Sequence, residues 1–172
     1  GYPGPLRELA GVWVEEIDAL APEQTNKITF ADGTSSTCSL LCDLIHLEGA
    51  QCVASYESNF YAGMPAITKN QYGKGYTYYI GTNPTEDGIV KVLDMAVQTA
   101  GVTSVVSVAT GLEITCRKTD RFTYYFIFNF KDKVLPLPEN FIGQKDLLTG
   151  EIIPEGCHLK QYDAYLVAFP NE

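Results

Sequence analysis

Carboxylates are the residues of this chain that could carry acid–base chemistry. Glu15 and Glu16 are adjacent on a predicted strand, so their side chains point to opposite faces and do not act together on one substrate. Asp43, Glu48 and Glu57 stand at the ends of predicted strands. Glycoside hydrolysis needs two acids held about 5–9 Å apart across a sugar cleft, and the spacing here selects no such pair. The sequence therefore predicts surface carboxylates and no catalytic residue.

Cysteine and histidine suggest a metal site only at first sight. Cys38, Cys42 and His46 are spaced by four residues, and Cys52 follows. On a strand the first three would share one face in a line about 26 Å long, at ~3.3 Å per residue, which does not close around one ion. The five cysteines are odd in number and loosely spaced, which indicates free thiols. We predict no metal and no cofactor.

Motifs for nucleophilic or nucleotide chemistry are missing from the sequence. There is no G-x-S-x-G or G-x-C-x-G elbow, no G-x-x-x-x-G-K-[ST] loop and no G-x-G-x-x-G fingerprint. The two histidines, His46 and His158, are interpreted as structural or surface residues.

Aromatic residues cluster in the first half of the chain. Aromatic rings bind the faces of sugars, and they also anchor protein cores and interfaces. Core and interface packing is the favoured interpretation, and an exposed sugar-binding platform is the alternative. The cluster comprises Tyr56, Phe60, Tyr61, Tyr72, Tyr76, Tyr78 and Tyr79.

Length and charge narrow the functional classes. The chain has 172 residues, a formal net charge of −9 and 45% hydrophobic residues, so it can form a packed core. The acidic balance argues against nucleic acid or an anionic membrane as the main partner. A complete (β/α)8 barrel needs roughly 250 residues and does not fit. No signal peptide is visible at the N-terminus, and no stretch has the ~18 apolar residues of a membrane span.

We expect two parts that differ in secondary structure, the first with mixed strands and helices and the second with strands only. In the first, Pro5–Gly11 predicts a short helix, Tyr72–Gly75 a hairpin turn, and Glu86–Ala100 a helix capped by Thr85. Ile89, Leu93, Ala96 and Ala100 form an apolar stripe, widened by Val92 and Val97, that predicts the helix face packed on a sheet. Further strands are predicted over residues 12–17, 27–30, 34–46, 51–56, 65–71 and 76–80. After a linker at residues 101–109, which we expect to continue into a strand, seven short strands up to residue 169 predict a small antiparallel sandwich.

The first part resembles a known family. Pro3–Gly11 (PGPLRELAG) with Glu15–Asp18 (EEID) is similar to a signature inside bacterial β-galactosidases of glycoside hydrolase family 42. A second similar segment runs from Cys42–Ile45 (CDLI) through Gly49–Ala50 to Tyr56–Ala66 (YESNFYAGMPA). It continues with Thr68, Asn70, Tyr72–Gly75 (YGKG) and Tyr78–Thr82 (YYIGT). The two segments match in order and spacing and cover most of residues 1–101. The remainder fits the small C-terminal β domain of such enzymes by position and texture.

The resemblance implies a fold and a role. Residues 1–104 would be the end of an amidotransferase-like (flavodoxin-like) α/β trimerisation domain, and residues 105–172 a small antiparallel β-sandwich. The family's catalytic glutamates and zinc-binding cysteines lie in a barrel that this chain lacks, so none is carried over. The chain would be a non-catalytic, cytoplasmic fragment whose partner is itself, as a homotrimer in the parent enzyme. A β-galactoside would be bound only through the missing barrel.

We predict that seven residues pack in an interface between copies or in the hairpin. They are Phe60, Tyr61, Pro65, Tyr72, Gly73, Gly75 and Tyr79. The alternative function is a carbohydrate-binding module that uses exposed aromatic residues. A free-standing enzyme of amidotransferase-like ancestry is a third candidate, which the missing nucleophile elbow disfavours.

Overall fold

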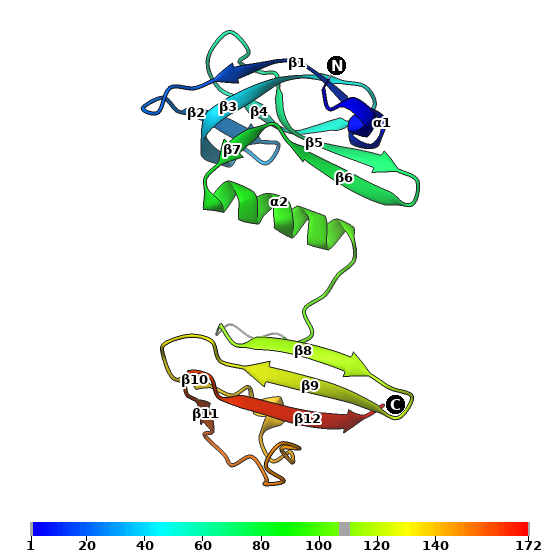
Figure 1. Cartoon of the computed structure of the whole chain (residues 1–172), viewed down its shortest axis with the longest axis vertical. Helices are drawn as coiled ribbons and strands as arrows, with labels where there is room; N and C mark the ends of the chain where they lie inside the picture. The colour runs from blue at the N-terminus through cyan, green and yellow to red at the C-terminus, as the bar shows by residue number, and fades with distance from the viewer. Residues whose placement is uncertain (1, 107–110, 172) are drawn as a thin grey trace. The chain divides into compact units, whose positions relative to one another are not determined.

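Two compact units make up the chain in a computed structural model that describes residues 2–106 and 111–171 (Figure 1). Unit 1 spans residues 1–103 and unit 2 spans residues 104–172. Residues 102–106 have no regular structure, and the rest of the strand expected near residue 109 lies outside the described residues. Each unit has its own hydrophobic cluster and is described separately.

Unit 1 opens with the short helix that the sequence predicts. A 3-10 turn, η1 (Gly4–Leu6), leads into α1 (Arg7–Ala10). Gly11 ends α1 at φ 63° and donates its N–H to the Arg7 carbonyl. The Asn70 side chain donates to the Leu9 carbonyl at 2.9 Å and lies against Gly11. A Cβ at Gly11 would stand 2.5 Å from the Asn70 side chain, so this position requires glycine for its contacts as well as its backbone.

An antiparallel sheet forms the body of unit 1. Its order is β1-β3-β2-β4-β5-β6, with β7 paired to β3, and each of these pairs is antiparallel. The strands are β1 (Val12–Ala19), β2 (Asn26–Phe30), β3 (Ser35–Leu47), β4 (Gln51–Tyr56), β5 (Pro65–Tyr72), β6 (Gly75–Ile80) and β7 (Thr82–Pro84). The strands expected from the hydrophobic pattern are therefore present.

The expected amidotransferase-like α/β fold is not confirmed for unit 1. A doubly wound sheet is mostly parallel, and each parallel connection needs a crossover of about a dozen residues. Here tight turns join β2 to β3 at Ala31–Thr34 and β5 to β6 at Gly73–Lys74, which permits only antiparallel pairing. The unit is mostly antiparallel sheet with few helices.

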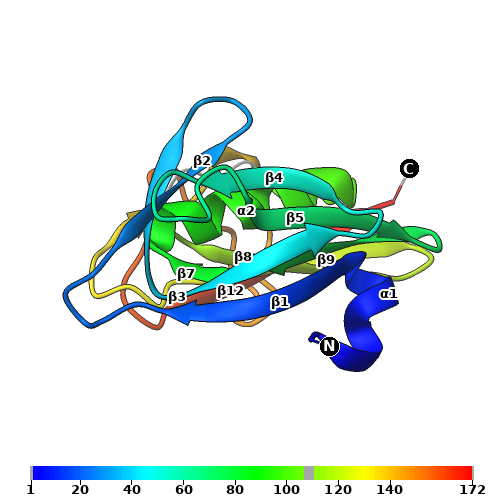
Figure 2. The ribbon, with the colours of Figure 1, turned by 90° about the horizontal axis from the view of Figure 1, so that it is seen from above.

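The helix α2 (Glu86–Thr99) packs on the sheet of unit 1 (Figure 2), through only part of the predicted apolar stripe. Gly88 and Val92 are its buried residues, whereas Leu93 is 57% exposed. Gly88 allows a close approach, because a Cβ there would meet the Ser36 hydroxyl oxygen at 2.6 Å. Thr85 precedes the helix, but its hydroxyl bonds Ser36 instead of a helical N–H.

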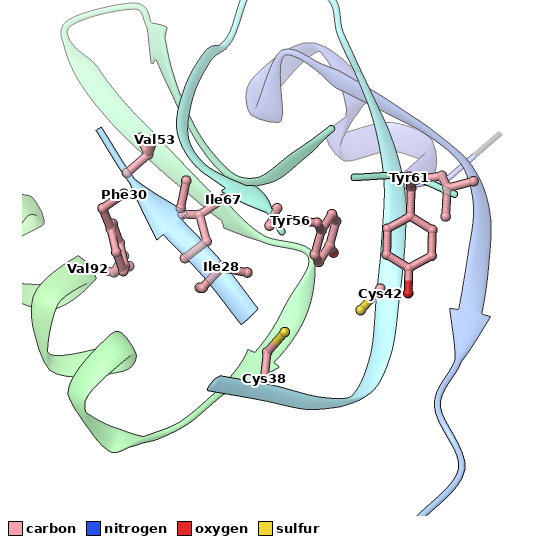
Figure 3. Close-up of a cluster of buried hydrophobic side chains, with 12 residues drawn as sticks. Ile28, Phe30, Cys38, Cys42, Val53, Tyr56, Tyr61, Ile67 and Val92 are labelled. Carbon is pink, nitrogen blue, oxygen red and sulfur yellow. The ribbon is translucent and has the colours of Figure 1, made fainter. Parts of the chain in front are cut away.

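The core of unit 1 lies between the sheet and α2 (Figure 3). Val92 of α2 joins side chains from β2, β3, β4 and β5, and Tyr61 joins them from the loop after β4. Other fully buried members of this cluster are Ile28, Cys38, Cys42, Ala66 and Ile67. A smaller cluster around Val12, Val14 and Ile45 sits beside α1.

Unit 2 is also an antiparallel β structure. Its main sheet has the order β12-β9-β8, and β10 pairs with β11 in a short ribbon. The strands are β8 (Glu113–Lys118), β9 (Phe122–Phe128), β10 (Leu135–Pro136), β11 (His158–Leu159) and β12 (Ala164–Pro170), with a 3-10 turn η2 (Glu139–Phe141). The segments predicted as strands near residues 145–153 contribute one isolated bridge, Lys145 to Ile152. The second layer of unit 2 therefore consists of loops and of the β10–β11 ribbon, whose strands have two residues each. The predicted sandwich would have a full second sheet at this place.

Asp146 organises the loops of unit 2. It is 1% exposed, and it accepts hydrogen bonds from the backbone N–H groups of Leu148, Thr149 and Leu166. Burial raises the pKa of this carboxyl, but the bonds together outweigh burial and hold the pKa below its usual value.

Candidate interaction surface

The loop at residues 57–64 joins β4 to β5 and is fixed at its base by Asn26. Asn26 is 3% exposed, and its side-chain oxygen accepts from the Ser58 N–H at 3.2 Å and the Ser58 hydroxyl at 2.6 Å. The same oxygen accepts from the Lys27 N–H, and the amide nitrogen donates to the Ser58 carbonyl at 3.2 Å. A side chain on β2 thus holds both polar groups of the Ser58 backbone.

Tyr61 fixes the other side of the loop. Its side chain is fully buried, and its hydroxyl donates to Asp18 of β1 at 2.8 Å. Asn59 adopts φ 69° and donates to the Tyr61 hydroxyl at 2.8 Å. The pKa of Tyr61 is raised, mainly because its hydroxyl is removed from solvent. Because the ring lies inside unit 1, Tyr61 packs in the core and offers no surface to a partner.

Phe60 is the exposed residue of the loop that Asn26 and Tyr61 hold in place. Its side chain is 78% exposed, the largest value among the large hydrophobic residues of the described chain. Its ring meets the ring of buried Tyr61 edge to face at 4.9 Å. A cleft of about 390 Å³ lies beside it, lined also by Asp18, Leu20, Gln24, Thr25 and Asn59. A rigid, solvent-exposed aromatic ring is what the centre of a protein interface uses.

The predicted hairpin contributes less to this surface. Tyr72 pairs with Gly75 across the turn, and Gly73 adopts φ 57°, so the glycine-dependent turn is confirmed at Gly73. Tyr72 is 47% exposed. Pro65 begins β5 and is half-buried. The structure places Phe60 and Tyr61 in one loop with Pro65 at the start of the strand that follows, and leaves Tyr72, Gly73 and Gly75 in a separate hairpin.

Tyr79 serves a buried polar contact. Its hydroxyl donates to the Asp43 carboxylate at 2.5 Å. Asp43 is 4% exposed, and its other carboxylate oxygen has no hydrogen-bond partner among the described residues. Burial raises the pKa of Asp43, and the bond from Tyr79 opposes this shift.

Two pairs of titratable side chains lie near the N-terminal helix and β1, Arg7 with Glu48 and His46 with Glu15. Arg7 bonds both carboxylate oxygens of Glu48 beside a shallow cleft that Glu8 also lines. The bond from Arg7 lowers the pKa of Glu48, whereas a proton-donating acid needs a raised pKa. His46 stacks on Trp13 and bonds Glu15 at 2.7 Å.

The five cysteines are free thiols, and the side chains of Cys38 and Cys42 interact with each other in the core of unit 1. Cys38 and Cys42 lie in the core on either side of a bulge, where Leu40 adopts φ 68°. Within the described residues no group of three histidine, cysteine or acidic side chains could hold a metal ion. No helix among those residues is long and apolar enough to cross a membrane.

Comparison with known proteins gives consistent results. A family profile described as "Beta-galactosidase trimerisation domain" matches residues 1–103. The chain is 45% identical over 152 residues to β-galactosidase LacA of Lactobacillus acidophilus, covering 88% of this chain and 23% of that protein. It is 39% identical over 173 residues to β-galactosidase BgaP of Planococcus sp. strain L4, covering 98% and 26%.

Solved structures agree with the sequence matches. The β-galactosidase of Bacillus circulans sp. alkalophilus superposes with a TM-score of 0.82 at 31% identity, covering 98% of this chain and 26% of that one. Gan42B, a GH42 β-galactosidase, gives 0.78 at 30% identity, with coverage of 96% and 24%. The chain spans about a quarter of the length of these proteins.

Proposed function

Because the chain belongs to the family of the β-galactosidase trimerisation domain, we propose that it is a non-catalytic, self-associating part of a glycoside hydrolase family 42 β-galactosidase. The match of residues 1–103 to that domain is the observation that carries the proposal. Unit 1 would hold copies of the parent enzyme together as a homotrimer, and unit 2 would support it.

The parent's chemistry would lie outside these residues. The matched relatives are named β-galactosidases and are about four times as long as this chain. The parent would hydrolyse terminal β-galactosides with retention of configuration, using two carboxylates about 5 Å apart. In the described residues the charged side chains that share a cleft at Arg7 and Glu48 neutralise each other, which supports a structural role.

Phe60 is the residue that we assign to the contact between copies. It combines the highest exposure with a loop fixed by Asn26 and by the Tyr61–Asp18 bond. A preorganised anchor loses little conformational entropy on binding, so most of the apolar surface that it buries contributes to affinity. Tyr72 and Tyr76 are about half exposed but belong to the separate β5–β6 hairpin. Phe60 therefore stands on a different element from the exposed rings of the hairpin.

Solution mass tests this proposal. Light scattering after size exclusion over a dilution series should give three times the 18.9 kDa chain mass at high concentration, falling on dilution. A constant mass of one chain at all concentrations would contradict self-association. The same sample should show no turnover of a chromogenic β-galactoside, and turnover that survives further purification would contradict the non-catalytic assignment.

A further inference from the structure

A second surface of unit 1 has the shape and chemistry to receive an aromatic ring. A cleft of about 340 Å³ lies between β2, β4 and α2, with Phe30, Val53 and Met95 among its apolar lining. We call it the apolar cleft. Engineered apolar cavities of about 150 Å³ bind benzene, so the volume is sufficient for a phenyl side chain.

Charges at the apolar cleft favour a ring with an acidic neighbour. Lys69, Lys91 and Asp32 line it, which leaves one positive charge in excess. The Lys91 ammonium bonds Asp32 and stands 4.7 Å from the centre of the Phe30 ring. The Lys69 ammonium stands 4.3 Å from the centre of the Tyr76 ring. Both lysines are thus held near aromatic surfaces, where a further ring gains a cation–π contact.

Phe60 presents the complementary features. The cleft beside it is lined by one charged residue, Asp18, which is acidic. Its ring is exposed and its backbone is fixed, so it projects from the surface as a knob. The two surfaces therefore complement each other in shape and in the sign of their charge.

The knob and the apolar cleft lie at opposite ends of β4. Cys52 and Val53 stand at the start of the strand, and Tyr56 ends it just before the Phe60 loop. Figure 3 shows Val53 and Phe30 at one end of the core cluster and Tyr61 at the other. Tyr56 lies four positions after Cys52 along the strand, a distance of about 13 Å. The two surfaces thus belong to different patches of one chain.

We propose that Phe60 of one copy inserts into the apolar cleft of a second copy of this chain. Such a contact is heterologous, because each copy contributes a knob to one neighbour and a cleft to the other. Heterologous contacts close into rings when the rotation between copies closes, whereas a self-complementary patch gives a two-fold dimer. This inference rests on the proposed self-association and specifies which surfaces meet. A head-to-tail contact is the type that a three-fold ring requires.

Two single variants test the contact. Phe60→Ala removes the knob, and Cys52→Phe fills the mouth of the apolar cleft at an exposed cysteine. Each should weaken self-association by roughly thirtyfold, the loss expected at an interface hot spot. Tyr72→Ala is the matched control, because it removes an exposed ring from the hairpin and should leave the dissociation constant unchanged. Circular dichroism melts that match the wild type verify that each variant folds.

Mixing the two variants separates this arrangement from other contacts. Phe60→Ala retains its cleft and Cys52→Phe retains its knob, so an equimolar mixture should form a one-to-one heterodimer that neither variant forms alone. Association of each variant with itself as tight as wild type would overturn the inference while leaving the proposed self-association intact. A wild-type chain that stays monomeric would instead refute the proposed self-association.

Cross-linking provides a positive signal for proximity. In a chain with Cys116 and Cys157 replaced by serine and Phe60 retained, Thr25→Cys beside Phe60 should be joined to Cys52 of another copy by a bismaleimide, giving covalent dimers and trimers. Adding Cys52→Ser should abolish the higher species. Cross-linking that persists without Cys52 would mean that the Phe60 surfaces of two copies face each other, and would overturn the head-to-tail arrangement.

Discussion

Replacing Asn26 with alanine should loosen the loop that presents Phe60 and destabilise unit 1. The variant loses four hydrogen bonds, from the Asn26 side chain to Lys27 and Ser58. At ~1 kcal/mol net for each bond the upper limit is about 4 kcal/mol. Ser58 is exposed, so water can replace part of what is lost. We therefore expect a decrease of about 2 kcal/mol in the free energy of unfolding.

Trp13 makes the measurement specific to unit 1. It is the only tryptophan of the chain and lies on β1, so its fluorescence during urea unfolding reports unit 1 and not unit 2. For a unit of about 100 residues, a loss of 2 kcal/mol corresponds to a melting temperature lower by roughly 10 °C.

An exposed asparagine serves as the control. The Asn83 side chain makes one long bond, 3.4 Å to the Ser39 hydroxyl, so Asn83→Ala should change the free energy by about 0.5 kcal/mol or less. If Asn26→Ala changes stability no more than Asn83→Ala does, the loop is not held by Asn26 and the reasoning fails. Asn26→Ala should also weaken self-association, because Phe60 would then be ordered only on binding.

Three further outcomes follow from the packing and the buried carboxylates. Gly88→Ala should destabilise unit 1 by about 1–3 kcal/mol in urea unfolding, although alanine has the better helix propensity, because its Cβ would meet the Ser36 side chain. Adding Ser36→Gly should restore part of the loss. A Gly88→Ala variant more stable than the wild type would refute the close approach of α2 to Ser36. Because the folded-state pKa of Asp43 is raised, the stability that its protonated carboxyl contributes is complete below pH 3.8, the ordinary pKa, and is lost as pH rises through the folded-state pKa. Asp43→Asn should therefore remove this part of the pH dependence of the free energy of unfolding. An unchanged pH dependence would contradict the assignment. The folded-state pKa of Asp146 is lowered, so the stability that its carboxylate contributes is present above pH 3.8 and is lost as pH falls through the folded-state pKa. Asp146→Ala should speed hydrogen exchange of the Leu166 backbone amide at pH 7, because that amide loses its acceptor. An unaltered exchange rate would count against this role.

Local elements of the fold could be predicted because single residues determine them. Gly11 at the end of α1 and Gly73 in the β5–β6 turn adopt the positive φ angles that their positions suggest. The Glu86–Thr99 helix was predictable in extent, and the face that packs was predictable in part. The predicted apolar stripe includes both Val92 and Leu93, and the close contact of Gly88 with Ser36 orients the helix so that Val92 is buried and Leu93 is exposed.

The candidate surface was only partly visible in the sequence. Phe60 and Tyr61 are adjacent aromatic residues with the same predicted role, yet one is exposed and the other is buried. The positive φ of Asn59 and the hydrogen bond to Asp18 decide which ring turns inward, and both depend on contacts across the sheet. No motif marks Asn26, whose importance follows from its position opposite Ser58. The resemblance suggested an α/β fold, whereas the short turns of this segment require antiparallel pairing.

The pairing of β3 has a consequence for the order of folding. This strand lies between β1 and β2, and it also pairs with β7, which follows it by some forty residues in the chain. On the ribosome, the sheet of unit 1 can therefore close only after residues 82–84 have left the exit tunnel. Unit 2 waits longer still, since β9 takes its second neighbour from β12 at the end of the chain. Pairing between such distant segments slows folding, so newly made chains pass through a period in which the β3 edge is open to other molecules.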